Sequence, residues 1–380
     1  MEKQKQWEEE FLKRISDKFL VVTDEIENLA PYAVRENGKY PKTDKPGYGW
    51  VCGFYGGIQW WLYHLTGEEK FLKKAKEISE WMDGALPEFV SLNHDVGFQF
   101  LLTTVADYIA TGSERAYVSG IHAATLMAGR FNPEGRYIRA WNDNKYIDPS
   151  RSKAGYIIVD CMMNIPLLFW AWQETGDPRF RQIAMLHADT TMQYFIRENG
   201  SSEHIVVMDP EKGIVVDKPK GQGYAEGSSW TRGQGWAIYG FAMAYHYTRK
   251  KEYLETSLRV AKNFLDKLPA DGNVPVDFDQ PETPAMYDES AAAIAVCGMI
   301  DLKKWVEEGD QELLEAGIRK LLKSLYDNSD LTTDNQSVVQ NCKQMYHDEP
   351  VQQTSLIYAD FYLLEALMKR RGETFLFGRK

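Results

Sequence analysis

The hydrophobic positions of this chain fall into long stretches separated by short polar turns. Stretches that are apolar on almost every side alternate with stretches whose charged residues lie on one side only. A helix that is apolar all round must be covered all round, whereas an amphipathic helix can lie outside it with its polar side in water. The alternation therefore predicts an inner layer and an outer layer of helices.

A short turn recurs between the two kinds of helix. Its copies begin at His64, Ile109, Gln173, His246 and Glu307. Recurring helix–turn–helix units are typical of repeat architectures. We expect twelve helices, near residues 7–28, 50–65, 68–83, 94–111, 113–129, 159–175, 177–197, 229–248, 250–267, 288–305, 309–327 and 354–371. They form six pairs, the number that closes an (α/α)6 barrel. We therefore predict an all-α fold in which residues 1–380 form a single domain.

One segment departs from the helical pattern. The stretch "HIVVMDPEKGIVVD" (204–217) places two β-branched runs around a Pro-Glu-Lys-Gly turn, which predicts a small β-hairpin. Connections rich in Gly, Pro, Asp and Asn precede most of the inner helices, at residues 29–49, 130–157, 199–228, 269–287 and 328–353. Long connections on one rim of a barrel are where a site is built, and none of them has the character of a linker between domains.

The charge and the longest apolar runs restrict the possible partners. The chain has 380 residues, a net charge of −11 and no basic run. Nucleic-acid binding needs a basic face, so we expect no nucleic-acid partner. No apolar run reaches the roughly 18 residues that span a bilayer, and the charged N-terminal segment lacks the apolar core of a signal peptide. We expect no membrane partner, and a monomer or homodimer in the cytoplasm, or in the periplasm if a leader has been removed.

The four cysteines give no sign of a metal or redox site. They follow no CxxC spacing, and no HExxH pair is present. Cysteines in apolar helical surroundings are usually buried thiols. We therefore expect free buried thiols, no metal and no cofactor.

Two aspartates stand where a polar segment meets an apolar one. Asp95 lies in "SLNHDVGFQFLL" and Asp160 in "YIIVDCMMNIPLLFWAW". Either acid alone could be a helix cap that accepts hydrogen bonds from free backbone N–H groups. Two carboxylates brought together in a dry site cannot both ionise, so one stays charged while the other holds a proton and acts as a general acid. We expect this second role for the pair, with Asn164 hydrogen-bonded to Asp160.

Polar and glycine-rich motifs mark the N-terminal ends of five predicted inner helices. They lie at residues 47–57, 93–98, 157–161, 227–236 and 287–293. If the inner helices run parallel, these ends meet at one mouth of the barrel. The N-terminal end of a helix favours negative charge, so such a mouth suits an acidic ligand.

Arg232 carries a charge into the start of an apolar helix. A buried arginine needs a carboxylate partner, which can be a side chain of the protein or the carboxylate of a ligand. Trp236 is four residues further on and lies on the same face, an arrangement that suits a sugar ring stacked on the tryptophan with its acid group on the arginine. Trp50 and Trp141, at loop ends, either fill a gap in the core or face a ligand. The sequence leaves these alternatives open.

Five motifs occur in order along most of the chain, from Trp50 to the last helix. They are "NHDVGFQF", "IIVDCMMNIPLLFWA", "TGDPRFRQIA", "SSWTRGQGWAIYGF" and "YADFYLLEAL". Together they resemble the unsaturated glucuronyl hydrolases, glycoside hydrolase family 88. The resemblance implies an (α/α)6 barrel without a cofactor. It also implies a substrate that a polysaccharide lyase has left with a Δ4,5-unsaturated uronic acid at its non-reducing end, and release of that sugar by hydration of its C4=C5 double bond.

The resemblance also implies roles for individual residues. Asp160 matches the acid/base residue of the family, and Asp95 matches its partner carboxylate. Three tryptophans match residues that face the sugar, and three polar residues match those around the unsaturated uronate: Trp50, Trp141 and Trp236, and His94, His204 and Arg232.

The chain departs from the family pattern in the turn before the Trp-Thr-Arg motif. Many members have a His-Gln-Gly triplet there, whereas this chain has Gly221 in place of the histidine, after Lys220. The change removes one expected substrate contact and can shift specificity. The loop 340–355 carries no pattern that indicates a preference for sulfated sugars.

Three other functions fit parts of the pattern. An unsaturated rhamnogalacturonyl hydrolase shares the barrel and the chemistry but takes pectin-derived products. A sugar epimerase on the same barrel uses histidines as acid and base, and few of the seven histidines stand near predicted helix mouths. A non-catalytic glycan-binding protein would use the aromatic residues, with the aspartates as caps.

Overall fold

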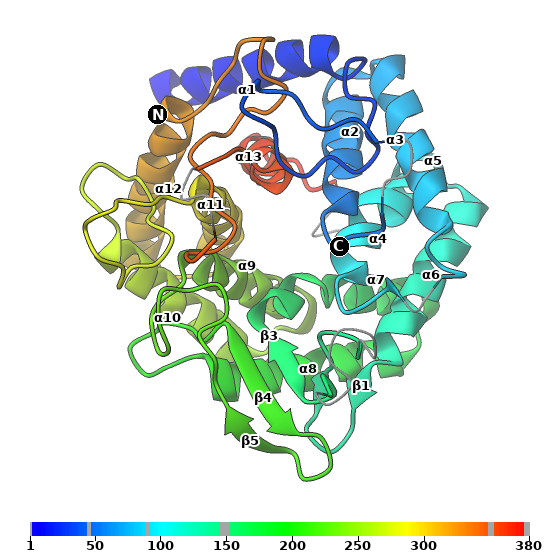
Figure 1. Ribbon diagram of the computed structural model, residues 1–380, viewed down its shortest axis with the longest axis vertical. Helices are drawn as coiled ribbons and strands as arrows, with labels where there is room; N and C mark the ends of the chain where they lie inside the picture. The colour runs from blue at the N-terminus through cyan, green and yellow to red at the C-terminus, as the bar shows by residue number, and fades with distance from the viewer. Residues whose placement is uncertain (1, 44–46, 89–90, 144–151, 349–352, 376–380) are drawn as a thin grey trace.

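The helices form two concentric rings around a common axis (Figure 1). The computed structural model describes residues 2–43, 47–88, 91–143, 152–348 and 353–375. The inner ring consists of α2 (Cys52–Thr66), the run of α4 (Val96–Phe100), the π-helical turn η2 (Leu101–Val105) and α5 (Ala106–Thr111), the run of the 3-10 helix η3 (Val159–Met163) and α7 (Pro166–Thr175), and α9 (Thr231–Thr248), α11 (Glu289–Lys303) and α13 (Ile357–Arg370). The outer ring consists of α1 (Glu2–Val22), α3 (Glu69–Asp83), α6 (Glu114–Ala128), α8 (Pro178–Phe195), α10 (Lys251–Lys267) and α12 (Glu308–Asp327).

The inner ring is closed by helices from the two ends of the chain. The last helix, α13, packs against α2 on one side and α11 on the other, and the first helix, α1, covers it from outside. Around the rest of the ring, α2 contacts α4 and η2, α4 contacts α7, η3 contacts α9, and α9 contacts α11. The structure is therefore an (α/α)6 barrel, which confirms the predicted fold class.

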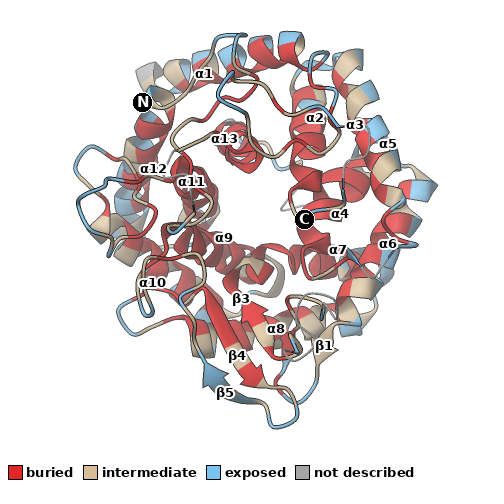
Figure 2. Ribbon diagram, in the orientation of Figure 1, coloured by how far each residue is buried: buried red, intermediate tan, exposed pale blue. Residues whose placement is uncertain are grey.

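Burial follows the alternation of the sequence pattern (Figure 2). In α9 every residue from Thr231 to Ala244 is buried, and in α11 every residue from Glu289 to Ile300 is buried. The outer helices α3 and α10 bury one side only. The barrel core is thus built from helices that have no solvent-facing side, as an all-round apolar sequence requires.

The predicted helix boundaries agree closely with the structure except at the first helix. We predict a helix over 7–28, and the structure has one over Glu2–Val22. Its first turns are rich in charged and polar residues, so no hydrophobic period marks its start. Ile26 lies beyond its end but is only 1% exposed, so the apolar period continues after the helix has stopped.

The predicted hairpin is confirmed on the rim of the barrel. Strands β4 (Ile205–Asp209) and β5 (Ile214–Asp217) pair antiparallel, with Asp209 opposite Ile214. Figure 1 shows this hairpin projecting from the ring of helices, below α8 and α10.

Three further strands are absent from the sequence prediction. Strand β3 (Tyr156–Ile158) pairs with β4, and a second small sheet joins β1 (Phe131–Asn132) to β2 (Tyr137–Ile138). Strand β3 is very short, and its partner lies far along the chain, so no local sequence pattern predicts it. Of the rim connections predicted to build the site, residues 44–46, 144–151 and 349–352 lie outside the described residues.

The cysteines are buried free thiols, as expected. Among the described residues, no helix is both long enough and apolar enough to cross a membrane. Within the same part of the chain, no group of three or more His, Cys, Asp or Glu side chains is arranged to hold a metal ion.

Neighbouring inner helices approach most closely at glycines. A Cβ atom on Gly97 would lie 2.3 Å from the Cα atom of Asn164, so the start of α4 rests directly on the chain that follows η3. A Cβ atom on Gly53 would lie 2.0 Å from the carbonyl oxygen of Phe98, which brings α2 equally close to α4. A larger residue at either position must push two backbones apart.

We expect Gly97→Ala to lower the free energy of unfolding by about 2–3 kcal/mol, because the added methyl group meets backbone atoms that cannot turn aside. Gly309→Ala is a matched control, since Gly309 in α12 is exposed and has nothing within 4 Å. Alanine there should raise the free energy of unfolding by about 0.5–1 kcal/mol through helix propensity. Urea unfolding followed by circular dichroism measures both, and equal stability of the two variants would show that the two backbones separate freely.

Candidate active site

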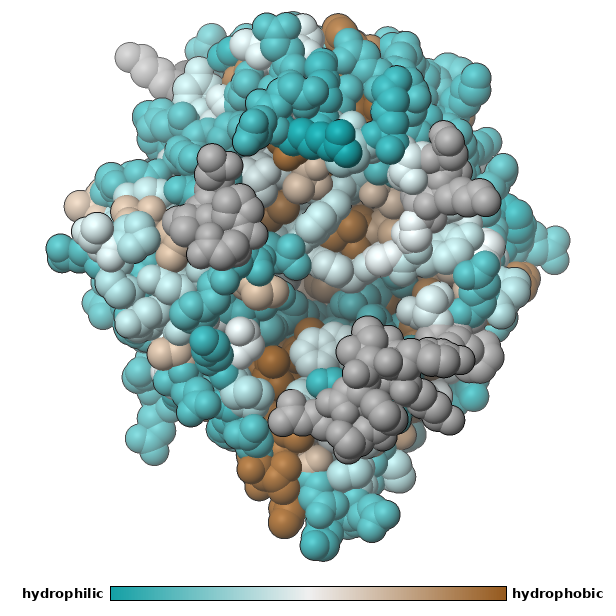
Figure 3. Space-filling model, viewed as in Figure 1, coloured by the Kyte–Doolittle hydropathy of each residue, from teal (hydrophilic) through white to brown (hydrophobic). Residues whose placement is uncertain are grey.

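The two candidate carboxylates come from neighbouring inner helices. Asp95 is the last residue before α4, and Asp160 lies within η3, ahead of α7. Their side chains keep 11% and 15% of their surface exposed, so both are largely withdrawn from water but not sealed. Figure 3 shows that this face of the barrel is hollowed at its centre. The charge of Asp160 acts on Asp95, so two acids 65 positions apart in the chain lie close together.

Asn164 ties together the two segments that carry these acids. Its side-chain oxygen accepts a hydrogen bond from the backbone N–H of Phe98 in α4 over 2.7 Å. Its side-chain nitrogen donates to the backbone carbonyl of Asp160 over 3.2 Å. The expected hydrogen bond to Asp160 is present, but it reaches the main chain rather than the carboxylate. Since both bonds hold backbone, Asn164 sets the distance between the two segments.

The rim sheet places a histidine beside Asp160. Asp160 follows β3 closely and His204 directly precedes β4, so the pairing of the two strands makes them neighbours. The backbone N–H of Val159 extends this pairing by donating to the carbonyl of His204 over 3.1 Å. The His204 Nε2 atom then lies 3.5 Å from Oδ2 of Asp160.

His94 lies behind the other acid. Its Nε2 atom is 3.4 Å from Oδ1 of Asp95, and its side chain is completely buried. Burial lowers the pKa of His94 to about 3, so the ring is neutral. The sequence resemblance places His94 near the uronate, whereas the structure places it against Asp95.

The pKa values of the two acids are driven apart. Burial, and after it the charge of Asp160, raise the pKa of Asp95 to about 7. Burial opposes the ionisation of Asp160 as well, but His204 first, and after it His94 and Arg232, hold its pKa below the usual value. The predicted separation of pKa values is present. In the substrate-free protein it is the pKa of Asp95 that is raised, whereas the resemblance assigns proton donation in the reaction to Asp160.

A third histidine, His187, also lies in this region. It belongs to the outer helix α8, is fully buried, and accepts a hydrogen bond at Nδ1 from the backbone N–H of Ile138 over 3.1 Å. Burial lowers its pKa to about 3, and its Nε2 atom has no hydrogen-bonding partner within the described ranges. The sequence analysis missed it. Its only signal is its position on the apolar face of an amphipathic helix, where a histidine is usually a core residue.

Arg232 finds its carboxylate partner inside the protein. Its Nη1 atom forms a 2.5 Å ion pair with the buried carboxylate of Asp288, at the start of α11. It also donates to the backbone carbonyl of Lys343 over 3.1 Å, while Nη2 donates to the side chain of Gln222 over 3.0 Å and to the carbonyl of Gln344. The sequence left open whether Arg232 pairs with a side chain of the protein or with a ligand carboxylate, and in the substrate-free structure it pairs with a side chain of the protein.

The three candidate tryptophans differ in how much surface they offer. The half-buried ring of Trp50 lies 4.9 Å from that of Tyr358 and 5.8 Å from that of Phe98, measured between centroids. Trp141 is half-buried and packs against the rim sheet. Trp236 is fully buried, 5.2 Å from Phe98. The predicted stacking of a sugar on Trp236 does not fit the substrate-free structure, because no part of its ring is accessible.

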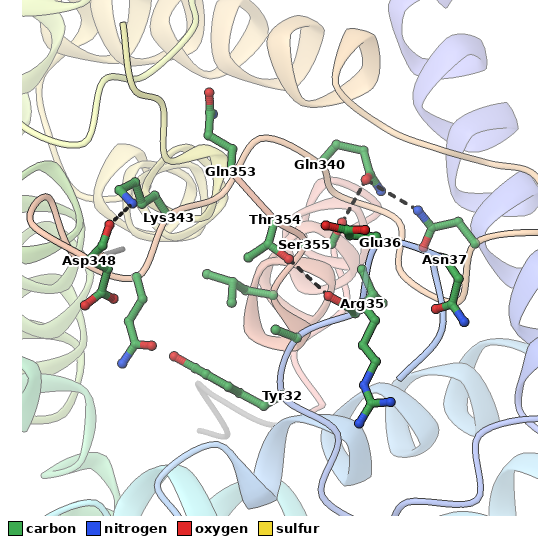
Figure 4. Close-up of a pocket in the computed structure, with 16 residues that line it drawn as sticks. Tyr32, Arg35, Glu36, Asn37, Gln340, Lys343, Asp348, Gln353, Thr354 and Ser355 are labelled. Atoms are coloured by element: carbon green, nitrogen blue, oxygen red, sulfur yellow. Dashed lines mark hydrogen bonds between the residues drawn. The ribbon is translucent and has the colours of Figure 1, made fainter. Parts of the chain in front are cut away.

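A cleft of about 840 Å³ is lined by residues that include Tyr32, Lys343 and Gln353 (Figure 4). It lies between residues 32–38 on one side and residues 335–348 and 353–356 on the other. Four of its lining residues are charged, Arg35, Glu36, Lys343 and Asp348, and seven carry amide or hydroxyl side chains: Asn37, Asn335, Gln340, Gln344, Gln353, Thr354 and Ser355. Its inner end meets the site at Gln344, which binds Arg232, and at Tyr32, whose ring centroid is 6.5 Å from that of Trp50. The two carboxylates are not part of its lining.

A closed (α/α)6 barrel with two withdrawn carboxylates and aromatic rings at one mouth suits an α/α-barrel glycosidase. The sequence profile of "Glycosyl Hydrolase Family 88" matches residues 24–370. The chain therefore belongs to glycosyl hydrolase family 88, the family indicated by its motifs.

Comparison with individual proteins agrees with this membership. The chain is 34% identical over 373 residues to the unsaturated glucuronyl hydrolase of Bacillus sp. (strain GL1), an alignment that covers 96% of this chain and 94% of that one. It is 30% identical over 330 residues to the unsaturated chondroitin disaccharide hydrolase of Streptococcus pyogenes serotype M1, covering 84% and 80%. The crystal structure of the Bacillus enzyme superposes with a TM-score of 0.89 at 30% identity, covering 99% of both chains.

We expect Arg232→Ala to lower the free energy of unfolding by about 3–5 kcal/mol at neutral pH, because it leaves the buried carboxylate of Asp288 without its partner. Burial already raises the pKa of Asp288. Lowering the pH should therefore protonate Asp288 in the variant. The difference in the free energy of unfolding between the variant and the unmodified protein should then become smaller as the pH falls to about 5.

Lys13→Ala is the control for this experiment, since it removes one half of an exposed pair with Asp17. Its stability should stay close to that of the unmodified protein at both pH values. Chemical unfolding at the two pH values measures the effect. If Arg232→Ala were as stable as Lys13→Ala, the buried pair would not support this part of the barrel.

Proposed function

We propose that this protein removes the Δ4,5-unsaturated uronic acid from the non-reducing end of lyase-generated oligosaccharides by adding water across the C4=C5 bond. The observation that carries the proposal is the pair of withdrawn acids with separated pKa values, Asp95 and Asp160. One proton and one charge on such a pair are what protonation of an enol ether, followed by addition of water, requires. Relatives named for action on unsaturated glucuronyl and unsaturated chondroitin disaccharide substrates support the same choice of substrate.

The reaction consumes one water molecule and leaves the protonation of the protein unchanged. Asp160 gives a proton to C4, and the positive charge that develops at C5 is shared with the ring oxygen. Water adds at C5, and the ionised Asp160 takes up the proton that the water loses. The resulting hemiketal opens, and C1 then releases the rest of the oligosaccharide as an alcohol.

Binding of the substrate moves the proton from Asp95 to Asp160. The pKa of Asp160 is held down in part by the positive charge of Arg232. A uronate carboxylate bound beside Asp160 brings a negative charge close to it and raises its pKa. A uronate that lies closer to Asp160 than to Asp95 favours the proton on Asp160. The substrate thus loads its own general acid.

The polar cleft holds the part of the oligosaccharide that leaves. Its amide and hydroxyl side chains match sugar hydroxyl groups, and Tyr32 contributes an aromatic face. Trp50 lies between Tyr32 and Phe98, where it suits the face of the unsaturated ring, and Trp141 supplies an aromatic surface on the rim.

A sugar epimerase is the alternative that the histidines favour. Three of them, His94, His187 and His204, lie near the acids, which is more than the sequence pattern indicates. His94 and His187 are completely buried, however, with pKa values of about 3, so neither is matched to proton exchange near neutral pH. The carboxylates therefore favour the hydrolase.

The purified protein should remove the ultraviolet absorbance of an unsaturated glycosaminoglycan disaccharide, because hydration destroys the conjugated double bond. No metal or cofactor should be needed. Asp160→Asn should lower kcat by about 10²–10⁴-fold while calorimetry still detects binding of the disaccharide. A panel of lyase products that differ in linkage and sulfation, with a pectin-derived product included, identifies the substrate class. Unchanged absorbance with every product would refute the hydrolase.

We expect kcat/KM to fall as the pH rises through about 7. Below this value Asp95 carries the proton that the pair shares, and above it both acids are ionised, because the pKa of Asp95 is about 7. Rates across pH 5–9 test this. The residual activity of Asp95→Asn, which has no proton to titrate there, should show no fall near pH 7. A fall that persists in this variant would assign the pKa to another group.

Gln344→Ala should raise KM by about 3–10-fold with kcat nearly unchanged, because it removes one neutral hydrogen bond to the leaving sugar. The carbonyl of Gln344 that binds Arg232 remains in this variant. Gln173→Ala is the control, since Gln173 is exposed near the C-terminal end of α7, away from the mouth. Steady-state kinetics on a disaccharide compare the two, and a lower kcat at unchanged KM would place Gln344 in a different role.

A further inference from the structure

A backbone hydrogen bond determines which ring nitrogen of His204 carries a hydrogen. The backbone N–H of Gln222 donates to Nδ1 of His204 over 2.9 Å. A ring nitrogen that accepts a hydrogen bond keeps its lone pair, so Nδ1 is not protonated, and a neutral imidazole then has its hydrogen on Nε2. The turn that contains Gln222 therefore selects the neutral Nε2–H tautomer.

The nitrogen that carries this hydrogen faces Asp160. The distance from Nε2 of His204 to Oδ2 of Asp160 is 3.5 Å, and no other hydrogen-bonding partner is found for either buried atom in the described part of the chain. A buried donor or acceptor without a partner is destabilising. Nε2 of His204 is such a donor and Oδ2 of Asp160 such an acceptor, so a hydrogen bond between them satisfies both. The distance is long for a hydrogen bond, as is common at catalytic groups before substrate binds.

Gly221 makes this arrangement possible. Its φ angle is +62°, and a Cβ atom built on it would lie 1.9 Å from Nδ1 of His204. Any side chain at position 221 would therefore occupy the space of the imidazole. The histidine that many family members carry in this triplet does not fit this backbone, so the glycine and the close approach of the turn to His204 belong together.

The same turn also contacts Arg232. The side-chain oxygen of Gln222 accepts a hydrogen bond from Nη2 of Arg232 over 3.0 Å, while its backbone N–H holds His204. The imidazole packs on the indole of Trp230, with 4.3 Å between the ring centroids. One turn thus contacts two of the groups that lower the pKa of Asp160, His204 and Arg232.

We propose that His204 is a positioning residue for Asp160, held by the Gln222 N–H as the neutral tautomer that donates from Nε2, and that Gly221 is the residue that permits this contact. The kinetic consequence rests on the proposed function, whereas the tautomer does not. The other titratable or charged groups that act on Asp160 or are affected by it come from several elements: Asp95 and His94 before α4, Cys161 in η3, Arg232 in α9 and Tyr362 in α13.

Nitrogen NMR of protein labelled with ¹⁵N-histidine tests the tautomer directly. Long-range ¹H–¹⁵N correlation at neutral pH should show His204 with a bare Nδ1 and a protonated Nε2, and comparison with His204→Gln assigns its signals. In Gly221→Ala the pattern should change, because the methyl group displaces the ring. Gly227→Ala is the matched control, since Gly227 lies in the same loop at φ +73° with nothing within 4 Å, and it should keep the pattern.

The dependence of kcat/KM on pH tests the positioning role. The hydrogen bond from His204 holds the pKa of Asp160 down. Without this hydrogen bond Asp160 is protonated at a higher pH, and the pair of acids then carries two protons. The acid limb of the profile should therefore move to higher pH by about one unit, which is about tenfold in relative rate at a given acid pH. His204→Ala and Gly221→Ala should show this shift. His204→Gln, whose amide N–H can still reach Asp160, should keep the acid limb in place.

Each outcome bears on the proposal. A cationic His204, or a His204 with its hydrogen on Nδ1, in the unmodified protein would overturn it. Identical acid limbs for His204→Ala and His204→Gln would overturn the positioning role even if Gly221→Ala failed to fold. If no lyase product is a substrate, the proposed function fails while the NMR result still decides the tautomer.

Discussion

The site depends on the close contact between the start of α4 and the chain that follows η3. Gly97 has no side chain, so the backbone of α4 rests on Asn164, and Asn164 in turn holds the N–H of Phe98 and the carbonyl of Asp160. A barrel of parallel inner helices only brings helix starts to the same mouth. This backbone contact brings two acids close enough for the charge of one to raise the pKa of the other.

The distribution of charge at the mouth explains why a proton is retained there. Arg232 is paired with Asp288, and in the described ranges no lysine or arginine forms an ion pair with Asp95 or Asp160. His94 beside them is neutral because it is buried. The partial positive charge at helix N-termini offsets one negative charge more easily than two, so the less solvated acid, Asp95, keeps its proton. The limited positive charge at the mouth thus leaves one proton on the pair of acids, and the proposed reaction uses that proton.

The barrel and its rim contribute different things to the site. The inner helices are buried on every side and supply the rigid positions of Asp95, Asp288 and Arg232. The rim segments contact these side chains. Strand β3 places Asp160 beside His204, and the backbone carbonyls of residues 343 and 344 accept hydrogen bonds from the guanidinium of Arg232. Loops on a rigid scaffold can change without disturbing the core, which is consistent with a glycine at position 221 and a polar cleft between two rim segments.

The sequence by itself determined the helices, the barrel, the β4–β5 hairpin and the two candidate acids. Each of these rests on a local pattern, since helical periodicity, turn residues and the start of an apolar run involve neighbours in the chain, and the motif resemblance added the reaction. Tertiary structure alone decided that Arg232 is paired with Asp288, that His187 lies near the acids, that Trp236 is inaccessible, and that the pKa of Asp95 is raised while that of Asp160 is lowered. These depend on burial and on charges contributed by segments far apart in the chain. Since the pKa of a carboxyl group is set by everything within a few ångströms of it, no local pattern could have specified which acid is protonated.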